Sequence, residues 1–175
     1  GPAVERAATS GDPDRFALPR MLAKDKSCDF SFAGLKTAAR RIFESEPAMD
    51  AAARADLAFA VQRAIANHLS ERAGRAMTRF AEAHPDAPRV LVVAGGVAAN
   101  AKVRAALEAV AGTHGFRLVA PPLKYCTDNA AMIALAGAER LALVLTDPLD
   151  APARARLPLD ERAAASDPAA GAGRK

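Results

Sequence analysis

The 175-residue sequence is poor in cysteine, histidine, tyrosine and tryptophan. It has two cysteines, three histidines, one tyrosine and no tryptophan. Cys28 and Cys126 lie far apart and form no Cys-x-x-Cys pair, which argues against a disulfide framework and a clustered zinc site. This cysteine content fits a reduced, cytoplasmic compartment.

Longer patterns are absent as well. The sequence has no Walker-type phosphate loop, no His-Glu-x-x-His motif and no internal repeat. Because it also has no charged-then-apolar leader and no long uncharged apolar run, we expect neither a secretory signal nor a membrane span. The formal net charge of +4 is compatible with a nucleic-acid partner but does not require one.

The apolar pattern predicts an α/β chain that is one domain or one lobe of a larger fold. Apolar residues at four-residue intervals predict a long helix over about 50–83, with a break at Gly74 as an alternative. The arginines along it are most simply a solvated face: Arg54, Arg63, Arg72, Arg75 and Arg79.

Short strands are expected at 29–32, 89–94 and 116–120, and further helices at 3–8, from about 34 to Pro47, at 100–110 and at 128–145. The alternation of strands and helices after residue 88 favours a right-handed βαβ unit on a mainly parallel sheet. The tail after Ser166 is rich in Ala, Gly, Asp and Pro and is expected to be disordered.

The segment 91–100 is the most informative stretch. It indicates a buried strand, a two-glycine turn at Gly95 and Gly96, and a helix opening at Asn100. Glycine lets a ligand approach the backbone, and the unpaired N–H groups of a helix start favour an anion there. A phosphate or nucleotide site and a plain tight connection are both consistent with this pattern.

A second helix start follows at Thr127-Asp128-Asn129. Loops after adjacent parallel strands emerge at one sheet edge, so this start can face the glycine turn. Asp128 either caps its helix or ligates a metal or orients a phosphate. Cys126 is interpreted as a small packing residue. The three histidines, His68, His84 and His114, have no ligand-like spacing and are interpreted as surface or capping residues; Lys36 is equally consistent with an anion contact and with a solvated side chain.

Three blocks together resemble the TsaD family of bacterial tRNA adenosine threonylcarbamoyltransferases: Asp29-Phe-Ser-Phe-Ala-Gly-Leu-Lys-Thr37, Ala94-Gly-Gly-Val-Ala-Ala-Asn100, and Tyr125-Cys-Thr-Asp-Asn-Ala-Ala-Met-Ile-Ala134. The resemblance implies the C-terminal lobe of an actin-like ATPase fold over residues 1–165. This lobe would contain a mainly parallel sheet with flanking helices and a helical insertion over about 34–85. Residues 166–175 would form the disordered tail.

The resemblance also implies an activity: transfer of the threonylcarbamoyl group from threonylcarbamoyl-adenylate to the N6 amine of the adenosine 3′ of the anticodon in tRNA. Asn100 would hold the adenylate over a backbone floor of Gly95 and Gly96, and Gly1 would belong to a Gly-Gly-Pro substrate loop. Asp128 would ligate one divalent metal ion, iron or zinc. The implied partners are tRNA, a TsaB-like paralogue and a TsaE-like ATPase, with no membrane.

The sequence departs from the family in one large respect. It has no His-x-x-x-His pair, which supplies the other metal ligands in the family, and no first phosphate loop. We therefore expect a C-terminal half that contributes part of an active site and that, alone, is inactive and binds metal poorly. Ala33 stands where the family commonly has serine. The alternative is a non-catalytic actin-fold module of the same tRNA-modification complex, which the presence of Asn100 and Asp128 disfavours. The block at 126–129 disfavours an actin-fold kinase.

Overall fold

A computed structural model describes residues 1–126 and 129–151 and divides the chain into two compact units, Gly1–Asn129 and a second that begins at Ala130. In the described part of the first unit there are four α-helices: α1 (Pro2–Ala8), α2 (Ala33–Ser45), α3 (Ala51–Ala83) and α4 (Ala101–Thr113). Its strands are β1 (Val90–Val92) and β2 (Arg117–Val119), and its short 3₁₀ turns are η1 (Gly96–Ala99) and η2 (Leu123–Tyr125).

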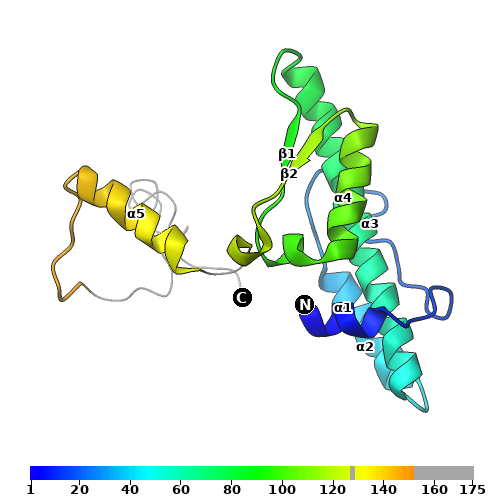
Figure 1. The fold of residues 1–175 in the computed structure, drawn as a ribbon. Coiled ribbons are helices and arrows are strands. Elements are labelled where there is room, and N and C mark those ends of the chain that lie inside the picture. The colour runs from blue at the N-terminus through cyan, green and yellow to red at the C-terminus, as the bar shows by residue number, and fades with distance from the viewer. Residues whose placement is uncertain (127–128, 152–175) are drawn as a thin grey trace, which may run out of the picture. The chain divides into compact units, whose positions relative to one another are not determined.

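Helix α3 is the element against which the first unit is assembled, since α1, α2 and α4 all pack on it (Figure 1). Asp50 caps its N-terminus by accepting a hydrogen bond from the Ala53 N–H at 2.8 Å, and the helix ends at Ala83, before Pro85. The break at Gly74 was a wrong alternative, because α3 continues through it. A Cβ at Gly74 would lie 3.0 Å from Nε2 of His114. The glycine therefore allows the end of α4 to approach α3 closely.

Strands β1 and β2 pair in parallel, with Val90 opposite Arg117, Leu91 opposite Leu118 and Val92 opposite Val119. Helix α4 connects them, which confirms the parallel βαβ unit. They are the two strands found in the described residues, so the larger sheet remains an expectation. The apolar core between α3, α4 and this sheet is formed chiefly by Ala66, Val103, Leu107, Met77, Ala111 and Phe116.

The strand predicted at 29–32 is wrong. This segment has no regular secondary structure, and its backbone bonds to a side chain instead: the Ser31 N–H donates to Nε2 of His68 at 3.3 Å. The rings of Phe30 and Phe32 meet the His68 ring edge-on, with centroids 6.2 and 5.3 Å away. The alternating aromatics thus enclose one imidazole rather than line one face of a sheet.

The solvated-face interpretation is also wrong for Arg72, which is fully buried. Its guanidinium donates to the backbone carbonyls of Leu22 at 2.7 Å and Asp25 at 3.1 Å. Arg75 donates to the same Asp25 carbonyl, and Arg79 to the carbonyl of Lys26 at 2.8 Å. The loop has one backbone hydrogen bond of its own, from the Asp25 N–H to the Leu22 carbonyl at 3.0 Å, and α3 supplies further donors to its carbonyls. Arg54, Arg63 and Arg79 are exposed as expected, and Arg75 is partly buried.

In the second unit the structure describes helix α5 (Ala130–Ala142), close to the helix predicted at 128–145. Thr127, Asp128 and residues 152–175, including the predicted tail, lie outside the described residues. Among the helices that are described, none combines the length and the apolar character needed to cross a bilayer.

Candidate functional site

Three of the residues singled out from the sequence line one cavity of about 480 Å³ in the first unit. Gly1 comes from the N-terminus, Gly96 from the start of η1, and Asn100 from the residue that precedes α4. The rest of the wall is largely apolar and is contributed by α1, α3, η1 and α4. These further lining residues are Pro2, Val4, Glu5, Val61, Gln62, Ile65, Val97, Ala99 and Val103.

Asn100 is held by two hydrogen bonds. Its Oδ1 accepts from the Val103 N–H at 2.9 Å and so caps α4, while its Nδ2 donates to Oε1 of the buried Gln62 at 2.9 Å. The predicted helix start at Asn100 is therefore confirmed as an N-cap. The contact with α3 fixes the orientation of the amide at the cavity wall.

The N–H groups at the start of α4 are less available than the sequence predicted. Oε1 of Glu5 accepts from the Ala101 N–H at 2.8 Å, and Asn100 accepts from Val103. A carboxylate from α1 thus already complements the positive end of this helix. The expectation of unpaired N–H groups there is wrong for Ala101, whose acceptor comes from a segment nearly one hundred residues away in sequence, and for Val103, whose acceptor is the N-cap Asn100 itself.

The two glycines of the turn have different roles in the structure. Gly95 has φ of +82°, a conformation that side-chain-bearing residues rarely adopt, and its carbonyl accepts from the Ala98 N–H at 3.0 Å. Gly96 opens η1 and lines the cavity. A Cβ at either position would meet nothing within 4 Å. The backbone conformation therefore favours glycine at position 95. At position 96 the absence of a side chain leaves open space at the cavity.

The metal expectation rests on Asp128, which lies outside the described residues. Within the described ranges there is no group of three or more His, Cys, Asp or Glu side chains arranged to hold a metal ion. The residues described here therefore do not form a metal-binding set by themselves. Cys126 is buried, and its Sγ lies 3.6 Å from the Pro121 carbonyl oxygen, which confirms its role as a packing residue.

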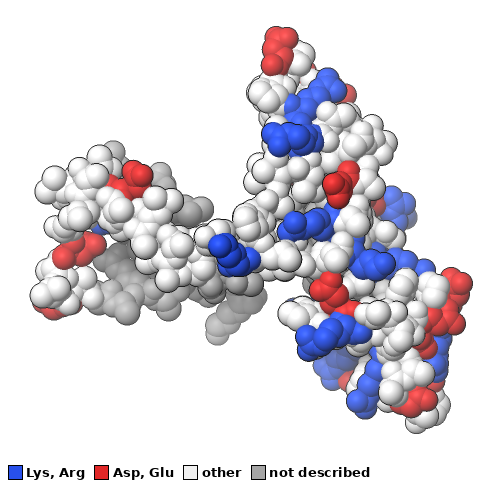
Figure 2. Space-filling view, in the orientation of Figure 1, with Lys and Arg blue, Asp and Glu red and all other residues white. Residues whose placement is uncertain are grey.

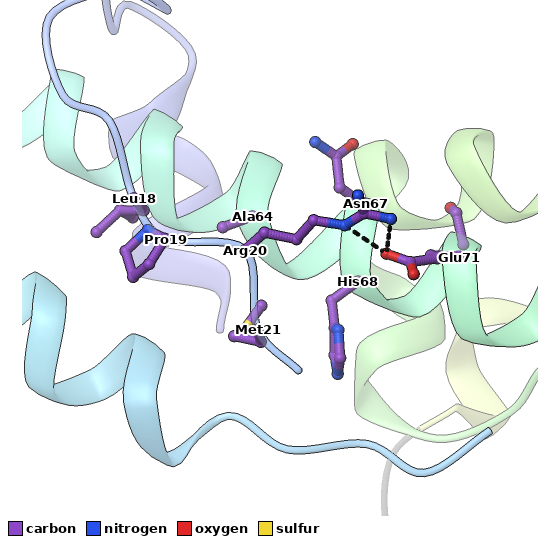
Figure 3. A pocket seen from close by; sticks show the side chains of 9 residues that line it. Leu18, Pro19, Arg20, Met21, Ala64, Asn67, His68 and Glu71 are labelled. Atoms are coloured by element: carbon purple, nitrogen blue, oxygen red, sulfur yellow. Dashed lines mark hydrogen bonds and ion pairs between the residues drawn. The ribbon is translucent and has the colours of Figure 1, made fainter. Parts of the chain in front are cut away.

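A second cavity of about 430 Å³ lies between residues 18–21 and α3 (Figure 3). Arg20 extends along α3 and donates from Nε to Oε2 of Glu71 at 2.9 Å. His68 lines the cavity and is only 3 % exposed, so the surface interpretation of this histidine is wrong; His84 and His114 are C-caps of α3 and α4, as expected. Burial, followed by the nearby Arg72 charge, lowers the pKa of His68. The position of His68 beside the apolar stripe of α3 is the sequence signal for its burial.

Comparison with known proteins places these features in a family. The model of the family described as "TsaD: tRNA N6-adenosine threonylcarbamoyltransferase" matches residues 1–135. A Maricaulis maris protein named tRNA N6-adenosine threonylcarbamoyltransferase is 63% identical over 177 residues, which cover 100% of this chain and 47% of that protein. Proteins of the same name from Caulobacter vibrioides and Sinorhizobium medicae are 61% and 54% identical, covering 100% and 94% of this chain and 47% and 46% of their own lengths.

The relatives are thus bacterial transferases named for a tRNA modification. The chain belongs to the TsaD family, and the recognition made from its three sequence blocks is confirmed. It spans about half the length of the curated relatives it matches.

Proposed function

We propose that this chain forms the C-terminal half of a tRNA N6-adenosine threonylcarbamoyltransferase, built as the C-terminal lobe of an actin-like ATPase fold. The observation that carries the proposal is the shared cavity of Gly1, Gly96 and Asn100, in a chain whose relatives bear the name of this activity. These residues were selected for substrate binding from the sequence, and separate elements bring them to one wall. The protein would act in the cytoplasm.

In this proposal the cavity receives threonylcarbamoyl-adenylate. Asn100 offers the second N–H of its amide, since one N–H is already donated to Gln62, and Gly96 leaves room for close approach of the ligand. The apolar side chains of Val61, Ile65 and Val97 provide a surface for the flat base. Gly95 contributes by holding the turn in its left-handed conformation.

The chemistry requires little covalent help from the protein. The N6 amine of the tRNA adenosine attacks the carbamoyl carbon, a C–N bond forms, the bond to the phosphate oxygen breaks, and AMP leaves while the amine loses a proton. Such a step is accelerated by orientation and by stabilisation of developing charge. A divalent iron or zinc ion, with Asp128 as one ligand, would polarise the reacting oxygens when bound. A TsaB-like paralogue and a TsaE-like ATPase are the proposed partners.

A chimera tests this function. The segment of the Maricaulis maris relative that the present chain does not cover is joined ahead of the 175 residues, and threonylcarbamoyl transfer to an unmodified tRNA transcript is measured. We expect the chimera to be active and the 175-residue chain alone to be inactive. Asn100→Ala in the chimera should raise the KM for the adenylate, while the exposed Lys24→Gln serves as the control.

The same chimera separates the proposal from the non-catalytic alternative. A stable chimera that assembles with the family partners but transfers no threonylcarbamoyl group would contradict the transferase proposal and favour an interaction module. Asp128→Ala is measured in parallel for bound metal; undiminished metal content would contradict the ligand role of Asp128.

A further inference from the structure

We propose that a groove between α3 and α4 binds a nucleotide unit of the RNA substrate beside the adenylate cavity; this rests on the proposed function. The groove has a volume of about 170 Å³ and is lined by Phe59, Gln62, Arg63, Ala66, Asn67 and Lys102. We refer to this set as the α3–α4 groove. It lies wholly in the first unit, and its walls come from two helices packed against each other.

The charge of the α3–α4 groove suits a phosphate. Arg63 of α3 and Lys102 of α4 both line it, and neither forms an ion pair with any residue in the described part of the chain. No acidic residue lines the groove. Figure 2 shows basic side chains spread over the visible face of this unit rather than gathered in one large patch. The groove is therefore a local site with two available cations.

The floor of the groove suits a nucleobase. The ring of Phe59 lies beneath the Arg63 guanidinium, with the guanidinium carbon 5.8 Å from the ring centroid. Aromatic rings and arginine planes stack on bases of any sequence, while unpaired cations contact the phosphate backbone. Ala66 is small, and the exposed Asn67, which also lines the 430 Å³ cavity, carries two amide donors and an acceptor that suit a base edge.

The groove adjoins the adenylate cavity through one residue. Gln62 lines both of them and accepts the hydrogen bond from Nδ2 of Asn100. A polynucleotide seated in the groove would therefore place a neighbouring nucleotide next to the Asn100 wall. The RNA is the ligand that the charge, the aromatic ring and this continuity together favour. The competing outcome is that the half of the protein outside this chain packs on the groove and covers it.

The test measures binding of an unmodified tRNA transcript to the chimera by fluorescence anisotropy over a series of salt concentrations. We expect Arg63→Gln with Lys102→Gln to weaken binding by about tenfold and to reduce the slope of log affinity against log salt by about 1.4. Phe59→Leu should weaken binding by about fivefold without changing that slope, because it removes stacking rather than charge. The matched control is Arg117→Gln with Lys24→Gln, two exposed cations outside the groove.

Each outcome of this test either supports or overturns the binding of RNA in the α3–α4 groove. Thermal unfolding of every variant establishes that it folds, so equal affinity and equal salt slope in groove and control variants would overturn the proposal and indicate that the groove is covered. A loss of tRNA affinity that is confined to the groove variants supports the proposal. Binding does not depend on turnover. A chimera that binds tRNA through the groove but transfers nothing would therefore contradict the proposed function alone.

Discussion

Nη2 of Arg72 donates a hydrogen bond to the backbone carbonyl of Leu22 at 2.7 Å, across fifty residues of sequence. Leu22 has φ of +48°, an unfavourable left-handed conformation for a branched side chain. The buried guanidinium also donates to Asp25 and Ser27. One side chain of α3 therefore holds a strained loop that contributes Met21 to the cavity beside His68.

Arg72→Met should destabilise the fold strongly. The substitution keeps most of the apolar stem but removes the buried donors to the carbonyls of Leu22, Asp25 and Ser27, which keep only the Asp25 N–H or Arg75 as partners. We expect the free energy of unfolding to fall by about 3 kcal/mol, measured by urea denaturation. Arg63→Met, an exposed arginine of the same helix, should change it by less than about 0.5 kcal/mol. Equal losses in the two variants would contradict the anchoring role of Arg72.

Gly11→Ala tests a close approach of the N-terminal segment to α3. An added Cβ would lie 2.3 Å from the Ala55 carbonyl oxygen and 2.7 Å from Cβ of Phe59. Since one contact is with backbone, we expect a loss of about 2 kcal/mol or more. Gly112→Ala in α4, where a Cβ meets nothing within 4 Å, should instead stabilise by about 0.5 kcal/mol. Calorimetric melting of both variants checks the opposite signs.

His68 should make the free energy of unfolding depend on pH. Burial, and next the Arg72 charge, lowers the pKa of His68 in the folded chain, with Glu71 acting in the opposite direction. As pH falls through the ordinary histidine pKa of about 6.5, the unfolded chain takes up the proton first. Unfolding is therefore favoured progressively between that value and the lowered folded-state pKa. Urea denaturation between about pH 7.5 and pH 5 measures this decline.

The matched variants are His68→Gln and His84→Gln. His68→Gln removes the titrating ring and should flatten the pH dependence in this window, whereas His84→Gln, which removes an exposed ring, should retain it. The lowered pKa values of Asp25, Asp56 and Glu71 have their effect at lower pH, below about 4.5. An unchanged slope in His68→Gln would assign the decline to other groups.

Asn100 has a structural role that can be separated from ligand binding. Asn100→Asp keeps an oxygen for the Val103 N–H but loses the donor to Gln62, whereas Asn100→Ala loses both. We expect Asn100→Ala to cost about 1 kcal/mol through loss of the cap and Asn100→Asp to cost less. Both should weaken adenylate binding in the chimera. If the Asn100→Asp chimera has the same KM for the adenylate as the native chimera, the Asn100 amide is not a donor to the ligand.

The sequence predicted the elements whose signals are local. The apolar period predicts α3, and the strand–glycine–helix pattern predicts β1, the turn and α4. Gly96 and Asn100 belong to a family block, and Gly1 was selected by resemblance to a Gly-Gly-Pro loop; all three line one cavity in the structure. Metal ligation by Asp128 stays a prediction, because that residue lies outside the described ranges.

The errors share a cause. The segment 29–32 has strand-like alternation, yet its partner is an imidazole; Arg72 resembles a solvated arginine, yet it bonds to a distant loop. Both depend on which residues meet across forty or fifty positions. Local periodicity contains no information about such long-range contacts.

By itself, the sequence determined the family, the helices and the parallel βαβ unit, because periodicity, caps and glycine turns act over a few residues. Only the tertiary structure decided that Glu5 complements the start of α4, that Arg72 and His68 are buried, and that Gln62 joins the cavity to the α3–α4 groove. The physical reason is that a polar group buried by folding must find its hydrogen-bonding partner among whatever residues the packing brings near.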